Sequence, residues 1–376
     1  MSLLRNALIV GLVASLGIIA SACGSGSADE PDKAAPAATT KATPAATTTT
    51  EAPADPDAAK FEVPAAGSGD GVKIGYISLG DQVPFVKLVS DDIKTEAKTA
   101  GAKLVSDDIK AEAKVAGAKL VFCDSQLDAA KALDCAKNFK TQGVDAIINF
   151  QVDEKSSPRI CAAGPKVPTI AVDINQKPCQ VSFMGANNQR AGEIAGEAMG
   201  NYFKSKFNCE YDSVVSMQQP AAGVVNTQRS GGALSAFEKI CGKAKNLKVV
   251  DGGGTIEGGQ KKFADVLTSL PGKHKIIILS LNDDMALGAL AAAKSQGRTK
   301  DLYLAGQGAD PTSHCQILNN PQWVGDAAYF PEKYGQIAVP AAIKAAKGED
   351  VSPKLFVPHV LINKDNIADY YKPANC

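Results

Sequence analysis

The sequence predicts an α/β fold in two lobes, each a parallel sheet with helices on both faces. Segments typical of strands alternate with segments typical of helices from about residue 71 onward. The strand segments are almost continuously apolar, which is typical of parallel strands buried on both faces. Roughly 300 residues remain for this folded part, and chains of that length usually divide into two lobes.

The expected elements follow one another with short connections. Strands are expected at 72–79, 118–125, 144–150, 167–173, 212–218, 247–253, 275–281 and 302–308. Helices are expected at 127–143, 157–163, 189–206, 226–242, 258–272 and 284–297. Further helical text lies between the first two strands, and Gly143 ends the helix that precedes the third strand.

The first 70 residues differ from this folded part. Residues 1–23 predict an export signal, with Arg5, an apolar run at 7–20 and small residues before Cys23. The run is shorter than the ~20 apolar residues that typically span a bilayer, and the alternative is an anchor that is never cleaved. Residues 24–70 are rich in Ala, Thr and Pro, so we expect a disordered tether.

Charge and cysteine content narrow the class of protein. The chain has 40 basic and 40 acidic residues, which gives no electrostatic reason to expect a nucleic-acid partner. Eight cysteines besides Cys23 predict disulfides in an oxidising compartment, with roughly a hundred possible pairings. The plausible local pairs are Cys123–Cys135, Cys161–Cys179, Cys209–Cys241 and Cys315–Cys376. No metal site is expected, because the sequence has no CxxC and only three histidines.

Polar residues gather at the carboxyl ends of the expected strands, where open parallel sheets bind ligands. They are Asp81, Gln82, Gln151, Asp153, Asp173, Asn175, Gln218, Asn282, Gln307 and Asp310. Amides and carboxylates hydrogen-bond hydroxyl groups, and no basic residue stands among them. We therefore expect a neutral, hydroxyl-rich ligand, with Phe85 and Tyr329 as candidate stacking faces for a sugar ring. Polar residues at strand ends also cap helices and close turns, which is the alternative for each.

Seven motifs occur in a fixed order along the chain. They are KIGYISLGDQVPF, GVDAIINF, VPTIAVD, MGANNQRAGEIAG, RSGGALSAF, LNDDMALGAL and LAGQGADP. Together, over residues 72 to about 363, they resemble the type I solute-binding proteins of sugar ABC importers, the ribose-binding group in particular. The resemblance implies the type I periplasmic binding protein fold, in which two Rossmann-like lobes are joined by three hinge crossovers. The placement of Cys23 also resembles a bacterial lipobox, which implies lipidation of that residue.

The resemblance also implies the lobe boundaries. The crossovers fall near Asn187, near Tyr329–Phe330 and near His359. The N-terminal lobe is then 71–186 plus 330–358, and the C-terminal lobe is 187–329 plus 359–376. Each of the four local cysteine pairs would lie within one lobe.

The family's ligand positions can be carried over in the first lobe. The aromatic residue of the first strand–helix loop falls on Phe85, and the aspartate that binds the sugar ring falls on Asp173. Ile174 stands where the family has an arginine.

In the second lobe, Thr227, beside Asn226, stands where ribose binders have their arginine, and Arg229 matches an arginine that is more often structural. Gly308 replaces an aspartate, and Tyr329 replaces the hinge glutamine. Both ligand-binding arginines are therefore missing, which argues against ribose itself. The expected ligand-binding set is Asp81, Gln82, Phe85, Asp173, Asn188, Asn226, Thr227, Asn282, Gln307, Asp310 and Tyr329.

Residues 88–103 and 104–119 are two 16-residue units that agree at 14 positions. Two copies are too few for a solenoid. One continuous helix would rotate its apolar face by about 160° between copies. We interpret the repeat as a tandem duplication, in which the first copy packs as the first helix and the second forms an extra helix outside the sheet. The alternatives are the reverse assignment and, ranked last because a new central strand would split the sheet, an added strand at 103–105.

These observations predict a monomeric binding lipoprotein on the extracytoplasmic face of the cell membrane. It would be anchored at Cys23 and would deliver a neutral sugar or polyol to an ABC permease, with no cofactor and no catalysis. An enzyme is disfavoured, because GxSxG, HExxH and Walker motifs are absent. A transcription regulator would need a DNA-binding motif before Val72, where the signal and tether lie. A ligand-sensing lipoprotein and a binder of an amino acid or nucleoside remain alternatives.

Overall fold

The computed structural model describes residues 58–101, 103–105, 119–151, 153–373 and 376. The expected export signal, the expected lipidation site Cys23 and residues 24–57 of the expected tether lie outside this part of the chain. Within the described part, no helix has the length and apolar character needed to cross a membrane.

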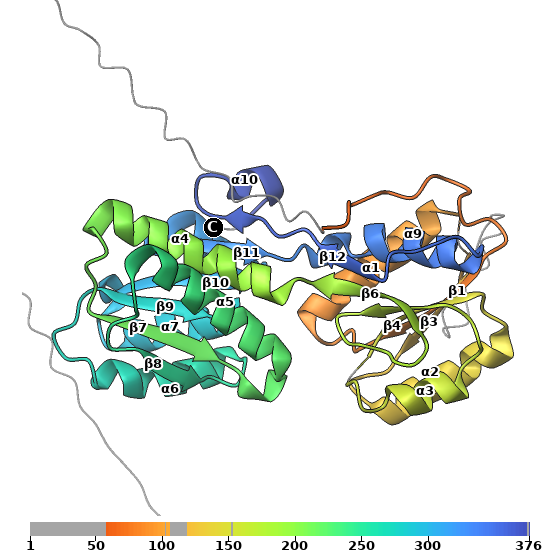
Figure 1. Cartoon of the computed structure of the whole chain (residues 1–376), viewed down its shortest axis with the longest axis horizontal. Coiled ribbons are helices and arrows are strands. Elements are labelled where there is room, and N and C mark those ends of the chain that lie inside the picture. Colours follow the sequence, from red (N-terminus) through yellow and green to blue (C-terminus); the bar gives the residue numbers. More distant parts are fainter. Residues whose placement is uncertain (1–57, 102, 106–118, 152, 374–375) are drawn as a thin grey trace, which may run out of the picture. The chain divides into compact units, whose positions relative to one another are not determined.

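The first of two sheets contains seven strands, all paired in parallel (Figure 1). In spatial order they are β12 (Lys354–Val357), β6 (Gln180–Ala186), β5 (Thr169–Val172), β4 (Ala146–Phe150), β1 (Lys73–Ser78), β3 (Lys119–Asp124) and β2 (Lys103–Val105). Its helices are α1 (Pro84–Thr99), α2 (Ala129–Gln142), α3 (Ser157–Ala163) and α9 (Gly335–Ala346). We call this sheet with its helices the first lobe.

Strands of the first lobe send alternate side chains into two cores, as strands covered on both faces must. On β1, Ile74 and Tyr76 pack with residues of α1 and α9. Ile77 points to the other face and packs with Phe139 of α2 and Ile160 of α3. This arrangement confirms the predicted fold class for the first lobe.

The second sheet contains six strands, parallel except for the β11–β13 pair. In spatial order they are β13 (Leu361–Ile362), β11 (Trp323–Ala328), β10 (Leu302–Gly308), β9 (Ile276–Ser280), β7 (Ser213–Gln218) and β8 (Lys248–Asp251). Its helices are α4 (Asn188–Phe207), α5 (Val224–Cys241), α6 (Ile256–Thr268), α7 (Asp283–Ser295), α8 (His314–Asn319) and α10 (Ile367–Tyr370). Residues of α4 and α5 share one core, and residues of α6 and α7 share another. This is the second lobe.

The chain passes between the two sheets three times. It does so from β6 into α4, from β11 through Tyr329 and Phe330 into α9, and from β12 into β13. His359 lies in the third passage and contacts the other two. Its Nε2 accepts a hydrogen bond from the Asn187 backbone N–H (3.0 Å), and its Nδ1 donates to the Ala328 carbonyl (2.9 Å).

All four local disulfides favoured by the sequence are present. Each bond joins elements of a single lobe, so the bonds brace the lobes without linking them. They are Cys123–Cys135, Cys161–Cys179, Cys209–Cys241 and Cys315–Cys376.

The duplicated segment is only partly as expected. The first copy forms most of α1 and buries Val89, Ile93 and Ala97, which confirms that it packs as the first helix. The strand at Lys103–Val105, which ranked last, is present as β2. That ranking was wrong because β2 adds to the outer side of β3 and leaves β3 beside β1, so the sheet is extended and not split. The helical part of the second copy lies outside the described residues.

Residues 58–70 correct the expected tether, which was drawn too long. The Ala59 backbone N–H donates to the Phe356 carbonyl (2.7 Å), and the Glu62 N–H donates to Gln336 (3.2 Å). Phe61 packs against buried residues, which is why this segment is ordered against the fold. We call residues 58–64 the N-terminal strap.

Candidate functional site

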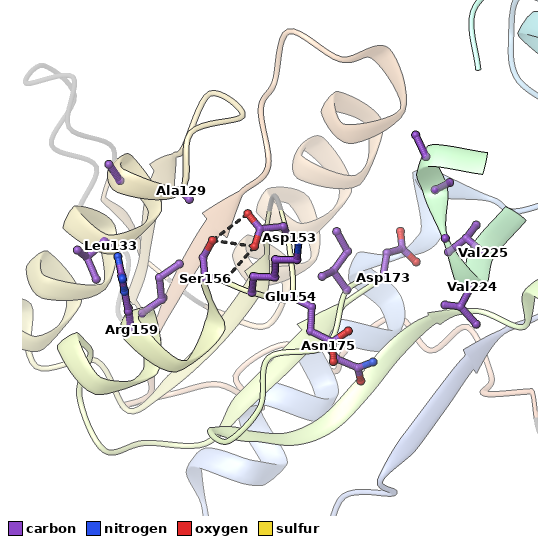
Figure 2. A pocket seen from close by; sticks show the side chains of 17 residues that line it. Ala129, Leu133, Asp153, Glu154, Ser156, Arg159, Asp173, Asn175, Val224 and Val225 are labelled. Atoms are coloured by element: carbon purple, nitrogen blue, oxygen red, sulfur yellow. Dashed lines mark hydrogen bonds between the residues drawn. The ribbon is translucent and has the colours of Figure 1, made fainter. Parts of the chain in front are cut away.

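A cavity of about 1330 Å³ opens at the carboxyl ends of β4 and β5. Asp153, Asp173 and Asn175 line one side of it, and residues 221–225 at the start of α5 line the other. Figure 2 shows Val224 and Val225 beyond Asp173, on the helix of the second lobe. The cavity therefore lies at the sheet edge where open parallel sheets bind ligands, with both lobes contributing to its walls.

Asp173 is the central acidic residue of this cavity. It directly follows β5 with φ of 55°, a left-handed conformation that costs energy for a residue other than glycine and is common at functional sites. Its Oδ1 accepts hydrogen bonds from the Ala186 N–H (3.3 Å) and the Tyr334 hydroxyl (3.4 Å). Burial raises the pKa of Asp173 to about 6, and the Arg229 guanidinium opposes that rise.

Arg229 on α5 is a half-buried cation that acts on Asp173, although it is not among the residues that line the cavity. Its Nε donates to Asn188 Oδ1 (2.7 Å), and the guanidinium carbon lies 4.5 Å from the centre of the Tyr329 ring. Its charge also acts on the pKa of Asp173 and of Asp310. In the family pattern this arginine is more often structural, and its contacts with Asn188 and Tyr329 are compatible with that role.

Close packing of α4 on α5 determines where Arg229 lies. A Cβ atom at Gly192 of α4 would be 2.2 Å from the Arg229 carbonyl oxygen, so any larger residue would push α5 away. This contact brings the Arg229 side chain beside Asn188 at the start of α4. The position of Arg229 could have been inferred from helical periodicity, because Arg229 lies about one turn after Asn226 on the same helix.

Three aromatic residues lie near Asp173 and Arg229. Phe85 packs edge-on against Tyr334, with ring centres 5.8 Å apart, and it also contacts the cluster that contains Tyr329. The sequence missed Tyr334. Tyr329, expected as an open stacking face, is only 3% exposed, and its hydroxyl donates to Gln307 Oε1 (3.3 Å). Tyr329 thus packs its ring against the Arg229 guanidinium, whereas Phe85 is only half-buried and stays a candidate stacking face.

Asp310 takes the place of the aspartate that the family pattern expects at Gly308. The φ of Gly308 is 147°, and a Cβ atom there would be 2.9 Å from Asp310 Oδ2. The Asp310 carboxylate therefore fills the space beside Gly308. Burial, and then the charges of Asp283 and Asp284, raise the pKa of Asp310 to about 8. In its protonated form this carboxyl group can donate a hydrogen bond.

Several expected ligand residues of the second lobe have partners within the fold. Asn282 caps α7 through the Met285 N–H (3.0 Å) and donates to the Gly254 carbonyl (2.8 Å). Asn226 accepts from the Gln219 N–H (2.8 Å), and Gln307 is buried and donates to the Ser280 carbonyl (3.1 Å). Thr227 is exposed and bonds its own helix. A ligand-binding role for these four residues stays a prediction.

Two expected residues of the first lobe are also separate from the cavity lining. Asp81 accepts from Ser78 (2.7 Å) and Ser90 (2.6 Å) and forms an ion pair with Lys94 (3.0 Å). Gln82 is exposed in the loop before α1. Asn188 is also outside the lining, and its Oδ1 accepts a hydrogen bond from Arg229 Nε (2.7 Å).

Charged residues that the sequence did not identify also line the cavity near the start of α3. They are Glu154, Lys155 and Arg159, and Figure 2 labels Glu154 and Arg159. For the residues that the structure describes, no cluster of three or more His, Cys, Asp or Glu side chains could hold a metal ion.

Comparison with known proteins identifies the family. Residues 86–350 match the model of a periplasmic binding protein domain. The chain is 26% identical over 260 residues to a putative rhizopine-binding protein of Rhizobium meliloti, covering 66% of this chain and 80% of that protein. It is 25% identical over 249 residues to the ribose import binding protein of Escherichia coli K12, covering 64% and 79%.

Solved structures share the fold. An ABC transporter solute-binding protein from Mycobacterium smegmatis with bound glycerol is 24% identical, with a TM-score of 0.64 over 79% of this chain and 96% of that chain. One from Bacillus halodurans C-125 with bound myo-inositol is 22% identical, with a TM-score of 0.63 over 81% and 98%. Because the family model spans most of the folded part, this chain belongs to the periplasmic binding protein family, as a type I binding protein and not an enzyme.

Proposed function

We propose that this chain is an extracytoplasmic lipoprotein that binds a neutral sugar or polyol beside Asp173 and delivers it to an ABC permease. One observation carries the proposal. Asp173 of the first lobe and Arg229 of the second lie close enough for the guanidinium to oppose the rise in the carboxyl pKa, and Phe85 packs on Tyr334, whose hydroxyl donates to Asp173.

This combination suits a ligand with many hydroxyl groups and no charge. A carboxylate accepts hydrogen bonds from hydroxyl groups, and a guanidinium donates to their oxygens in a fixed fork. The two charges have opposite signs, so an uncharged ligand adds no unbalanced charge beside them. The protonated Asp310 adds a donor from the second lobe, and Phe85 offers a flat apolar face to ring C–H groups.

The position of Arg229 near Asp173 makes ribose a candidate ligand again. The sequence disfavours it because two arginines of the family pattern are missing, at Ile174 and Thr227. Arg229 supplies a guanidinium beside Asp173 from another position on α5. Glycerol and myo-inositol are bound by two proteins of the same fold, and ribose is named for a relative, which supports a small hydroxyl-rich ligand.

A thermal-shift panel tests the ligand class. The chain without residues 1–23 is melted with D-ribose, D-allose, arabinose, myo-inositol and glycerol, and with amino acids and nucleosides as controls. A ligand at a hundred times its Kd adds about 2.7 kcal/mol of stability, which is several degrees. A shift with a sugar or polyol supports the proposal. A shift only with an amino acid or a nucleoside would overturn the ligand class while leaving the family assignment intact.

The lipid anchor is a separate part of the proposal. It rests on Cys23, which follows three small residues and precedes the Ala/Thr/Pro-rich segment. We expect the full chain to be found in the membrane fraction. The variant Cys23→Ser should either appear in the soluble fraction or retain residues 1–23 uncleaved. Mass analysis of the N-terminal peptide gives a direct reading, and an unmodified Cys23 in a membrane-bound wild-type chain would contradict lipidation.

A further inference from the structure

The N-terminal strap runs along the outer edge of the first lobe. Ala58 forms a parallel bridge with Phe356 of β12, which is the last strand at that edge of the sheet. The Glu62 N–H then donates to the Gln336 carbonyl on α9 (3.2 Å), and Pro64 is buried. The strap thus has backbone bonds to two elements of one lobe, which fix its course.

One side chain of the strap reaches beyond that lobe. Phe61 contacts the core that α1 and α9 share with the first sheet, and it also contacts the core of the second sheet beneath α6 and α7. Its ring meets Phe330 edge-on, with centres 5.7 Å apart. The Lys333 ammonium lies 5.3 Å from the Phe61 ring and 4.8 Å from the Phe330 ring.

Phe330 occupies the second passage between the sheets, after β11 and before α9. Its φ of 53° and ψ of 55° are left-handed, an unfavourable conformation for a bulky residue that persists only where the surroundings hold it. Tyr370 and Tyr371 of the C-terminal tail pack against the same ring, each with centres 5.9 Å away. Phe330 is therefore held by segments from both ends of the described chain.

We propose that the N-terminal strap is a hinge clamp, in which Phe61 holds Phe330 in its left-handed conformation and so restrains rotation of one lobe against the other. Such rotation concentrates changes of φ and ψ in a few connecting residues. Phe330 cannot change its backbone conformation without moving its ring away from Phe61. The point where the expected tether joins the fold is then also the point that controls lobe closure. The inference concerns the hinge alone and does not depend on the identity of the ligand.

Hydrogen exchange of the secreted chain without ligand tests the clamp. Phe61→Ala is compared with Val63→Ala, a matched change on the same strap at a side chain that is 62% exposed. The reporters are the backbone N–H groups of Ala328, Tyr329 and Lys333, which bond Val360, Gly308 and Phe330. Strand β9 at the centre of the second sheet serves as the internal reference.

We expect Phe61→Ala to speed exchange several-fold at the three hinge amides and to leave β9 unchanged, with little effect of Val63→Ala. Equal exchange in the two variants would overturn the clamp. A uniform increase that includes β9 would also overturn it, because Phe61 would then add only general stability. Phe61→Leu, which keeps an apolar side chain, should lie between wild type and Phe61→Ala and gives the same test if the alanine variant folds poorly.

Discussion

The carboxyl edge of the first sheet and that of the second use their polar side chains differently. In the first lobe, Asp173 is directed into the cavity by a left-handed backbone at the end of β5. In the second lobe, the polar residues at the strand ends, Asn282 and Gln307, form hydrogen bonds inside the fold. Our proposal assigns the ligand contacts of that lobe to Arg229 and Asp310 in their place. A polar residue at a strand end therefore marks the correct edge of a sheet without revealing which side chain meets the ligand.

The largest expected effect is a loss of stability when the buried carboxyl groups at the carboxyl edge of the second sheet are displaced. At Gly306 on β10, a Cβ atom would be 2.5 Å from both Asp283 Oδ1 and Asp326 Oδ2, which are fully buried. Gly306→Ala should lower the free energy of unfolding by more than about 3 kcal/mol, since neither carboxyl group can move away. Gly231→Ala is the control, because a Cβ there meets open space on helix α5 and should add up to about 1 kcal/mol. Similar urea midpoints for both variants would contradict this description of the second edge.

The next effect depends on pH and concerns Asp310. Its pKa is raised from 3.8 to about 8 by burial and by neighbouring carboxyl groups, so between these values the folded state binds a proton that the unfolded state has released. This contribution to stability is complete below pH 3.8 and is lost as the pH rises towards 8. Asp310→Asn has no carboxyl group at this position, so the variant does not lose this stability as the pH rises. The Tm difference, variant minus wild type, should increase from pH 4 to 8, whereas Asp350→Asn at an exposed site should give a constant difference. A flat difference for Asp310→Asn would show that its carboxyl group is not buried as described.

A smaller effect sharpens the comparison at Asn282. Loss of a helix cap costs about 1 kcal/mol, so Asn282→Ala should lower stability by that amount. The Kd for a sugar identified by the thermal-shift panel should change less than about threefold, because both ends of this amide already have partners. A Kd increase of more than tenfold in calorimetry, with stability unchanged, would instead make Asn282 a ligand residue as the family pattern implies.

The smallest effect is expected at Thr227. Its side chain is exposed and bonds only the Gly223 carbonyl, at 3.4 Å. Thr227→Ala should change both the melting temperature and the Kd within error, since exposed substitutions usually stay within ~0.5 kcal/mol. A clear loss of affinity would place the second-lobe contact at Thr227, where the sequence puts it, and not at Arg229.

Much of the fold could be predicted because its signals are local. Apolar runs identify the strands, and the glycine at 143 ends α2 with φ of 60°. The four disulfides could be favoured because each of them joins two cysteines that follow one another in the order of cysteines along the chain. The strap could not be predicted, because one phenylalanine in a short segment gives no periodic pattern of apolar residues, and its partner, Phe330, is distant along the chain.

The duplicated segment shows a different limit of sequence reasoning. The triplet KLV occurs as β2 and as the start of β3, and the two copies pair with each other residue for residue, from Lys103 with Lys119 to Val105 with Val121. Because the two triplets are identical, the local sequence cannot show which of them forms the inner strand and which the outer strand. The inner copy is distinguished by the two residues after its triplet, because Phe122 packs on Tyr76 and Cys123 is bonded to Cys135. The corresponding residues after the outer copy are Ser106 and Asp107.

The central claim is that Arg229 binds the ligand from the second lobe while Asp173 binds it from the first. It is tested most directly by calorimetric titration of wild type, Arg229→Ala and Arg159→Ala with the sugar or polyol that gives the largest thermal shift. Arg159 is the control, because it is an exposed arginine that lines the cavity from α3 of the first lobe. We predict that Arg229→Ala raises the Kd at least about a hundredfold, as expected when a charge-assisted contact is lost, and that Arg159→Ala changes it little. Wild-type affinity in Arg229→Ala would contradict the claim.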